Sequence, residues 1–153
     1  MKRTLIAILT LSTVAGASWL RREDRPEYAY YGAEWIGHAL PKEVPAGGSV
    51  SGPVMVRNTG TCWWGRDSSV KIAYSIFDES GKRLVAFGSG VFPIESTVAP
   101  GQVLTTWPTV TAPKEPGNYR YRFDMLLERV NWFEERGGKP LIVPVVVNQP
   151  ALE

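Results

Sequence analysis

Apolar and charged residues alternate most regularly between Tyr119 and Glu128. Every second position there is apolar, while Arg120, Arg122 and Asp124 occupy positions in between. Successive side chains of a β-strand point to opposite faces, so a period of two places all the apolar side chains on one face. We therefore expect a half-buried strand that packs its apolar face against a core.

Shorter segments of the same kind follow one another from Glu34 to Val147, and turns rich in Gly and Pro, such as Pro41–Gly48, separate them. The predicted strands comprise residues 34–40, 50–57, 70–76, 83–88, 92–97, 102–111, 119–128 and 140–147. No helical periodicity occurs after residue 25. We predict an all-β domain, an antiparallel immunoglobulin- or fibronectin-like β-sandwich of about seven or eight strands, with a tight barrel as the alternative.

The chain begins with a short basic head, followed by the uncharged residues 4–20. These residues would span about 25 Å as a helix, which is the lower limit for crossing a bilayer. The segment is either a signal peptide cleaved near Ala17 or a signal anchor that stays in the membrane as a hydrophobic helix. We favour the anchor, with Trp19 at the far interface. Its membrane-embedded residues are Leu5, Ile6, Ile8, Leu9, Leu11, Val14, Trp19 and Leu20.

These patterns divide the chain into four parts. Residues 1–25 form the signal anchor or signal peptide, residues 26–32 a connector, residues 33–148 the sandwich and residues 149–153 a tail. We expect a single-pass protein of the bacterial inner membrane, with the sandwich on the periplasmic side. Cleavage near Ala17 would instead give a periplasmic or secreted domain.

The net charge of +2 comes from the N-terminus. The first 25 residues contain five basic and two acidic residues, whereas the rest contains 12 basic and 13 acidic ones. The sandwich therefore has no excess of positive charge for a nucleic-acid backbone, and we expect no nucleic-acid partner. Cys62 is the only cysteine, so no intrachain disulfide can form, and we expect its thiol to be buried or half-buried.

The sequence contains no pattern typical of a catalytic or metal site. His38 is the only histidine and lies in a predicted strand, so a nucleophile–histidine pair would have to use it. Asp124 and Glu128 on one strand would be about 13 Å apart, farther than a glycosidase pair requires. We expect no enzyme activity, no metal and no cofactor.

Two loops carry adjacent aromatic residues, which cannot all point inward. We expect Trp64 to be a core residue, with a binding role as the less favoured interpretation. For the two loops as a whole, folding back to cover the core is as well supported as exposure for binding. The tyrosines of the connector would lie at a membrane surface or partner, or would cover one end of the sandwich. The predicted partner-binding residues are Trp63, Trp64, Trp132, Phe133, Tyr28, Tyr30 and Tyr31.

Four motifs occur in a familiar order. They are VRNTGTxxW from Val56 to Trp64, VAPG from Val98 to Gly101, TAPxxPGNY from Thr111 to Tyr119, and DxxxExxxWFxxxG from Asp124 to Gly137. Together they resemble an immunoglobulin-like domain that is common in bacterial exported and glycosyltransferase-associated proteins. This domain is similar to the four-tryptophan domain of the eukaryotic selective-autophagy receptor family.

The resemblance covers about Ala33 to Val147 and implies a β-sandwich used for protein interaction; it implies no reaction. Trp35, Trp63 and Trp107 have no assured equivalents in that family. Tyr119, which follows Pro116-Gly117, is placed to bond back to the preceding loop as a tyrosine corner does.

We therefore expect a non-catalytic, membrane-anchored periplasmic accessory subunit that binds and stabilises a larger membrane protein complex. An energy-transducing complex, photosynthetic or respiratory, is one setting for such a subunit. Its partners would be other protein subunits and, through residues 4–20, the lipid bilayer. The alternative is a carbohydrate-binding module of the cell envelope.

Overall fold

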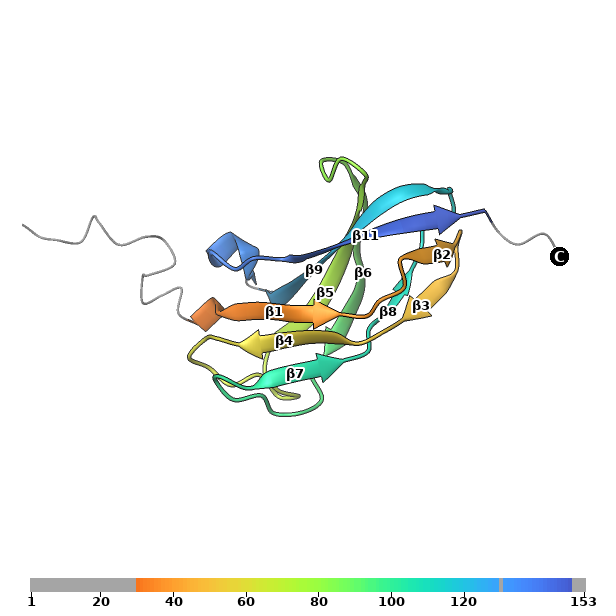
Figure 1. Cartoon of the computed structure of the whole chain (residues 1–153). Coiled ribbons are helices and arrows are strands. Elements are labelled where there is room, and N and C mark those ends of the chain that lie inside the picture. The colour runs from red at the N-terminus through yellow and green to blue at the C-terminus, as the bar shows by residue number, and fades with distance from the viewer. Residues whose placement is uncertain (1–29, 130, 150–153) are drawn as a thin grey trace, which may run out of the picture.

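The chain folds into a β-sandwich, as the computed structural model shows for residues 30–129 and 131–149 (Figure 1). The anchor segment, the connector up to residue 29 and the tail from residue 150 lie outside the described residues. No helix within the described ranges is long and apolar enough to cross a membrane. The strands are β1 (Ala33–His38), β2 (Glu43–Pro45), β3 (Ser49–Ser51), β4 (Val54–Asn58), β5 (Val70–Asp78), β6 (Leu84–Pro93), β7 (Val103–Thr106), β8 (Thr109–Thr111), β9 (Gly117–Leu127), β10 (Asn131–Trp132) and β11 (Leu141–Asn148).

Two main sheets face each other across the core. The larger has the order β2-β11-β9-β5-β6, with β10 beside β9, and the smaller has the order β1-β4-β7. β3 and β8 form a separate antiparallel pair. The largest fully buried side chains are those of Trp64, Tyr74, Tyr121, Phe123, Phe133, Ile72, Ile94 and Met125.

The predicted alternation of β9 is confirmed. Tyr121, Phe123 and Met125 are buried in the core, whereas Arg120 and Arg122 lie on the outer face of the sheet. β9 pairs antiparallel with β5 on one side and with β11 on the other, so its backbone groups are satisfied within the sheet. This strand organises the larger sheet.

Two long predicted strands are each divided in the structure. The segment 50–57 is interrupted at Gly52-Pro53, and the segment 102–111 is interrupted at Trp107-Pro108. Proline has no N–H to donate to a ladder. A Cβ on Gly52 would lie 2.7 Å from the carbonyl oxygen of Ala39, so this position requires glycine. As a result, each segment contributes one strand to the smaller sheet and one to the β3–β8 pair.

Two further predictions are wrong. The segments 83–88 and 92–97 are not separate strands, because β6 runs without a break from Leu84 to Pro93. The segment Pro41–Gly48 is not only a turn: it contains β2, which pairs in parallel with the end of β11. The larger sheet is therefore antiparallel except at this edge, and the strand count exceeds the prediction.

The tyrosine corner is confirmed. The Tyr119 hydroxyl donates to the backbone carbonyl of Glu115 over 2.9 Å, which fixes the loop that leads into β9. Gly117, the first residue of β9, has a φ of 157°, and Tyr119 itself is buried. The bond links the central strand to its preceding loop.

Replacing Tyr119 by Phe removes this one hydrogen bond and keeps the ring. We expect the free energy of unfolding to fall by about 0.5–1.5 kcal/mol, the net value of a typical intramolecular hydrogen bond. Urea unfolding measures the change. Tyr31→Phe is the matched control, because no described residue bonds to the Tyr31 hydroxyl; an equal loss in both variants would contradict a role for the corner.

Candidate functional site

One end of the sandwich brings together three aromatic segments that are far apart in the sequence. Tyr30 and Tyr31, just before β1, form an edge-to-face pair with centroids 5.2 Å apart. Tyr31 packs on Phe133 at 5.2 Å, and Phe133 packs on Trp64 at 6.3 Å. We call these four residues and Trp63 the aromatic end. It lies where β1 begins and β4 ends, at the left of Figure 1.

The side chain of Asn58, the last residue of β4, holds the loops at this end. Asn58 is fully buried, and its amide nitrogen donates to the carbonyl of Cys62 over 2.8 Å and to that of Val98 over 3.1 Å. Its amide oxygen accepts from the backbone N–H of Gly60 over 3.0 Å. One side chain therefore ties the loop after β4 to the loop before β7.

The backbone of Asn58 adds to these links. Its N–H donates to the carbonyl of Gln102, and its carbonyl accepts from Gly101. Trp64 and Val98 exchange two backbone hydrogen bonds of 3.0 and 2.8 Å, which form an isolated bridge between the same loops. With its backbone held in this way, Trp64 points into the core.

A close approach of two backbones also shapes this end. A Cβ on Gly32 would lie 2.4 Å from the backbone nitrogen of Gly60, which is too close for any other residue without a backbone shift. The carbonyl of Gly32 accepts from the N–H of Thr59 over 3.0 Å. Gly32 thus joins the aromatic connector to the motif around Asn58.

The predicted partner-binding residues have different positions in the structure. Trp63 is 62% exposed, whereas Trp64 and Phe133 are 1% and 0% exposed. Trp64 and Phe133 are therefore core residues, as preferred for Trp64, and their side chains offer almost no surface to a partner. Trp132, Tyr30 and Tyr31 are half-buried, and Tyr28 lies outside the described residues.

Tyr30 lies close to the single thiol. Burial raises the pKa of the Tyr30 hydroxyl, and the neighbouring Cys62 and Tyr31 add to the rise. Cys62 is a free cysteine that is half-buried, as expected.

Trp132 lines a second feature, a shallow pocket of about 350 Å³ on the outer face of the larger sheet. Asp124 lines the same pocket but is only 4% exposed. Its oxygens accept from the backbone N–H groups of Met125 at 2.8 Å and Glu134 at 3.1 Å, and Arg122 pairs with the Glu134 carboxylate. Burial raises the pKa of the Asp124 carboxyl to about 7, although the Met125 hydrogen bond and the Arg122 guanidinium lower it.

The Asp124 carboxyl is thus held by two backbone N–H groups. By accepting from the N–H of Glu134, Asp124 holds the short 3-10 helix Glu134–Arg136 against β9. This closes the loop that carries Phe133 over the core. The sequence suggested only a polar face for Asp124, because the partner backbone is ten residues away.

No reactive arrangement is apparent around the candidate residues. The Nδ1 atom of His38 accepts from the backbone N–H of Leu40 at 3.3 Å. Within residues 30–129 and 131–149, no three His, Cys, Asp or Glu side chains gather as a metal site would require. The absence of an enzyme activity stays a prediction.

One exposed aromatic residue was missed among the candidate sites. Trp107 is 63% exposed and follows β7 at the end opposite to the aromatic end, since β7 begins beside Arg57 and ends beside Val54. The hydroxyl of Ser51 donates to its carbonyl over 3.4 Å. Trp107 stands directly before Pro108, which divides β7 from β8. This position was the signal in the sequence that could have indicated an exposed tryptophan.

Comparisons with known proteins identify the fold and no family. No protein-family model matches the chain, and no curated protein matches it. A β-glucosidase from Listeria innocua, solved in complex with glucose, is similar over 79% of this chain and 16% of its own, with 19% identity and a TM-score of 0.52. The CARDB domain of the PF1109 protein from Pyrococcus furiosus, solved with di-metal ions, covers 76% of this chain and 88% of its own, with 15% identity and a TM-score of 0.49. At these identities the likeness shows the fold alone.

Gly32→Ala tests the close approach at the aromatic end. We expect the added methyl group to push the connector away from Thr59 and to lower the free energy of unfolding by about 1–3 kcal/mol, the usual cost of overpacking. Gly37→Ala is the matched control in β1, since its Cβ would meet only the end of Met55 at 3.7 Å. Thermal unfolding of both variants measures the difference; equal stability would contradict the proposed constraint.

Asp124 should make stability depend on pH in an unusual direction. Its folded pKa of about 7 lies above its ordinary value of 3.8, so the unfolded chain loses this proton first as the pH rises. Its contribution to stability is therefore fully present below about pH 4 and is lost as the pH rises to about 7. Urea unfolding across this range measures it, and Asp124→Asn should flatten the profile, whereas the exposed Asp67→Asn should not. An unchanged profile in Asp124→Asn would refute the assignment.

Proposed function

We propose that the chain is a non-catalytic accessory subunit, anchored in the bacterial inner membrane, that binds a larger membrane protein complex through its aromatic end. The observation that carries this proposal is the exposure of Trp63 at the end of the sandwich where the chain enters from the N-terminal segment. An energy-transducing complex is one such setting.

The length of the connector supports this orientation. Only ten residue steps separate Leu20, the last residue of the hydrophobic segment, from Tyr30. Even a fully extended chain spans at most about 3.6 Å per residue, so the aromatic end would lie within about 35 Å of the membrane surface. Membrane proteins and the subunits bound to them present surfaces within that distance.

The chemistry of Trp63 also supports a protein partner. An exposed tryptophan is costly to leave in water, and tryptophan is enriched among the residues that dominate protein interfaces. The backbone of the neighbouring Trp64 is bonded to Val98 and the carbonyl of Cys62 to the Asn58 amide, so the loop is ordered before binding. A preformed loop loses less conformational entropy when the partner binds.

The proposal also includes the type of β-sandwich to which the chain belongs. We assign the sandwich to the immunoglobulin- or fibronectin-like type, and the tyrosine corner at Tyr119 supports this. Asn58 also gives a physical role to the VRNTGTxxW motif, which supports the resemblance to four-tryptophan interaction domains.

Trp107 favours a second candidate, a carbohydrate-binding module. Trp107 is exposed and lies beside Ser51 of β3, whose hydroxyl donates to the Trp107 carbonyl, and two residues before Thr109 of β8. A flat indole beside hydroxyl groups can stack on one face of a sugar and bond to its edge. On a glycan array, Trp107→Ala would abolish such binding, whereas Trp63→Ala would leave it unchanged.

The native size of the chain after gentle detergent extraction tests the main proposal. We expect the wild-type chain to migrate within a larger complex and Trp63→Ala to release it, because loss of a central interface tryptophan typically costs about 2 kcal/mol or more. Trp107→Ala is the control, with the same residue type and an exposure of 63% against 62%.

A wild-type chain that migrates alone would count against the proposal. So would release by Trp107→Ala and not by Trp63→Ala, since it would place the partner at the opposite end. Circular dichroism of each variant shows whether the sandwich stays folded.

A further inference from the structure

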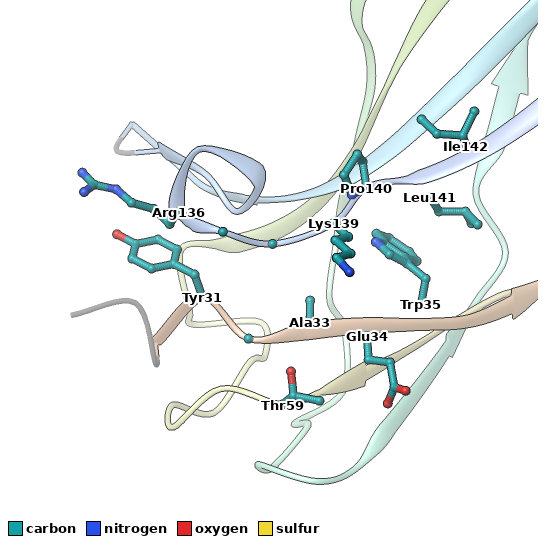
Figure 2. Close-up of a pocket in the computed structure, with 13 residues that line it drawn as sticks. Tyr31, Ala33, Glu34, Trp35, Thr59, Arg136, Lys139, Pro140, Leu141 and Ile142 are labelled. Carbon is teal, nitrogen blue, oxygen red and sulfur yellow. The ribbon is translucent and has the colours of Figure 1, made fainter. Parts of the chain in front are cut away.

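An open groove of about 740 Å³ lies between β1 and the segment that leads into β11. Tyr31, Ala33 and Trp35 line one wall, and Lys139 and Leu141 line the other. Figure 2 shows the Trp35 ring rising from β1 toward Lys139 and Leu141. The groove is thus a gap between the edges of the two main sheets.

The wall formed by β1 is a free strand edge. Among the described strands, β1 pairs with β4 alone. The hydrogen bond from the N–H of Thr59 to the carbonyl of Gly32 shows which residues of this segment face β4. In an antiparallel ladder these residues alternate, so Gly32 and Glu34 face β4 while Ala33 and Trp35 turn their N–H and C=O groups toward the groove. No described strand pairs with these groups.

The opposite wall cannot accept a strand. The N–H of Val146 in β11 donates to the carbonyl of Lys42, so the residues that alternate with Val146 turn their backbone toward the same edge. These include Pro144 and Pro140, which have no N–H, and this leaves Ile142 as the sole donor of that stretch. Proline on an edge strand prevents pairing, so an added strand would bond to β1 alone.

The charges around the groove select the partner. Its charged side chains are those of Arg136, Lys139 and Glu34. Glu34 is already paired with Arg57 at 2.6 Å, and Arg136 is bonded to Asn131. Lys139 makes no ion pair within the described part of the chain. The groove is therefore positively charged, and an acidic segment complements it.

Trp35 provides a further recognition group. Its ring is half-buried, and its indole Nε1 is buried with no hydrogen-bond partner among the described residues. A buried donor without an acceptor is destabilising. A small shift of the ring on binding would bring this donor to a carbonyl or carboxylate oxygen of the segment.

We propose that this groove binds an extended acidic segment of a partner protein, which adds to the free edge of β1 as a new strand. Backbone groups of Ala33 and Trp35 pair with the segment, and Lys139 contacts its carboxylates. This site goes beyond the membrane-subunit function, because it requires neither Trp63 nor the anchor.

Fluorescence anisotropy with two labelled peptides tests this site on the full-length chain in detergent micelles. One peptide alternates glutamate and valine, and the other alternates lysine and valine. We expect the acidic peptide to bind and the basic one not to bind. Lys139→Glu should weaken binding by about tenfold, the equivalent of 1.4 kcal/mol, while Lys82→Glu in the distant β5–β6 turn should have no effect.

Ala33→Pro tests strand addition directly. Proline removes the N–H that faces the groove and leaves the hydrogen bonds to β4 intact, so the fold should tolerate it. We expect at least about tenfold weaker binding of the acidic peptide, with Ala33→Val binding as the wild type does. Amide chemical shifts report whether each variant is folded; if Ala33→Pro unfolds, Lys139→Glu decides the outcome.

Three results would overturn the proposal. They are equal binding of both peptides, no binding of the acidic peptide, and unchanged binding by Lys139→Glu or by folded Ala33→Pro. Self-association of the wild-type chain that Ala33→Pro abolishes would also overturn it, because a second copy would then occupy β1. These results are independent of the complex-size assay with Trp63→Ala.

Discussion

The buried side chain of Asn58 is the constraint on which the aromatic end depends. A primary amide in a core must satisfy its donors and its acceptor, because each buried polar group without a hydrogen-bond partner destabilises the fold. Both amide hydrogens of Asn58 and its oxygen have partners, on Cys62, Val98 and Gly60. Those partners come from two loops, so the amide can be satisfied only when both loops take up this one arrangement.

The positions of the aromatic side chains follow from that arrangement. With Cys62 and Val98 both bonded to Asn58, the Trp64–Val98 bridge can form, and Trp64 enters the core. Trp63 precedes it in the chain and stays 62% exposed. Phe133 and Tyr31 then pack in series on Trp64, which connects the core to the segment that enters from the N-terminus.

The sequence predicts those features that depend on local pattern. The alternation of β9 and the tyrosine corner at Tyr119 could be predicted, because each involves neighbours in the chain. The divided strands could not, because Gly52 and Pro53 end a strand only in relation to Ala39. The parallel pairing of β2 with β11 joins residues about a hundred positions apart, and no local signal marks it.

The candidate site was predicted in part for the same reason. The aromatic residues were identified by type, but whether Trp63 or Trp64 is exposed depends on a bridge to Val98, which lies in another loop. Phe133 is buried because Asp124 holds the backbone of Glu134 beside it. Trp107 was missed because a single tryptophan before a proline resembles a core residue of a longer strand.

Amide hydrogen exchange of Asn58→Ala is the most direct test of this account. The substitution removes the amide that joins the two loops and keeps the backbone of β4. We predict that the amides of Gly60, Trp64 and Val98 lose protection while those of β5 and β9 keep theirs, and that Asn118→Ala, which removes an exposed amide, changes neither. Unchanged protection at Gly60, Trp64 and Val98 in Asn58→Ala, or a uniform loss across β5 and β9, would contradict it.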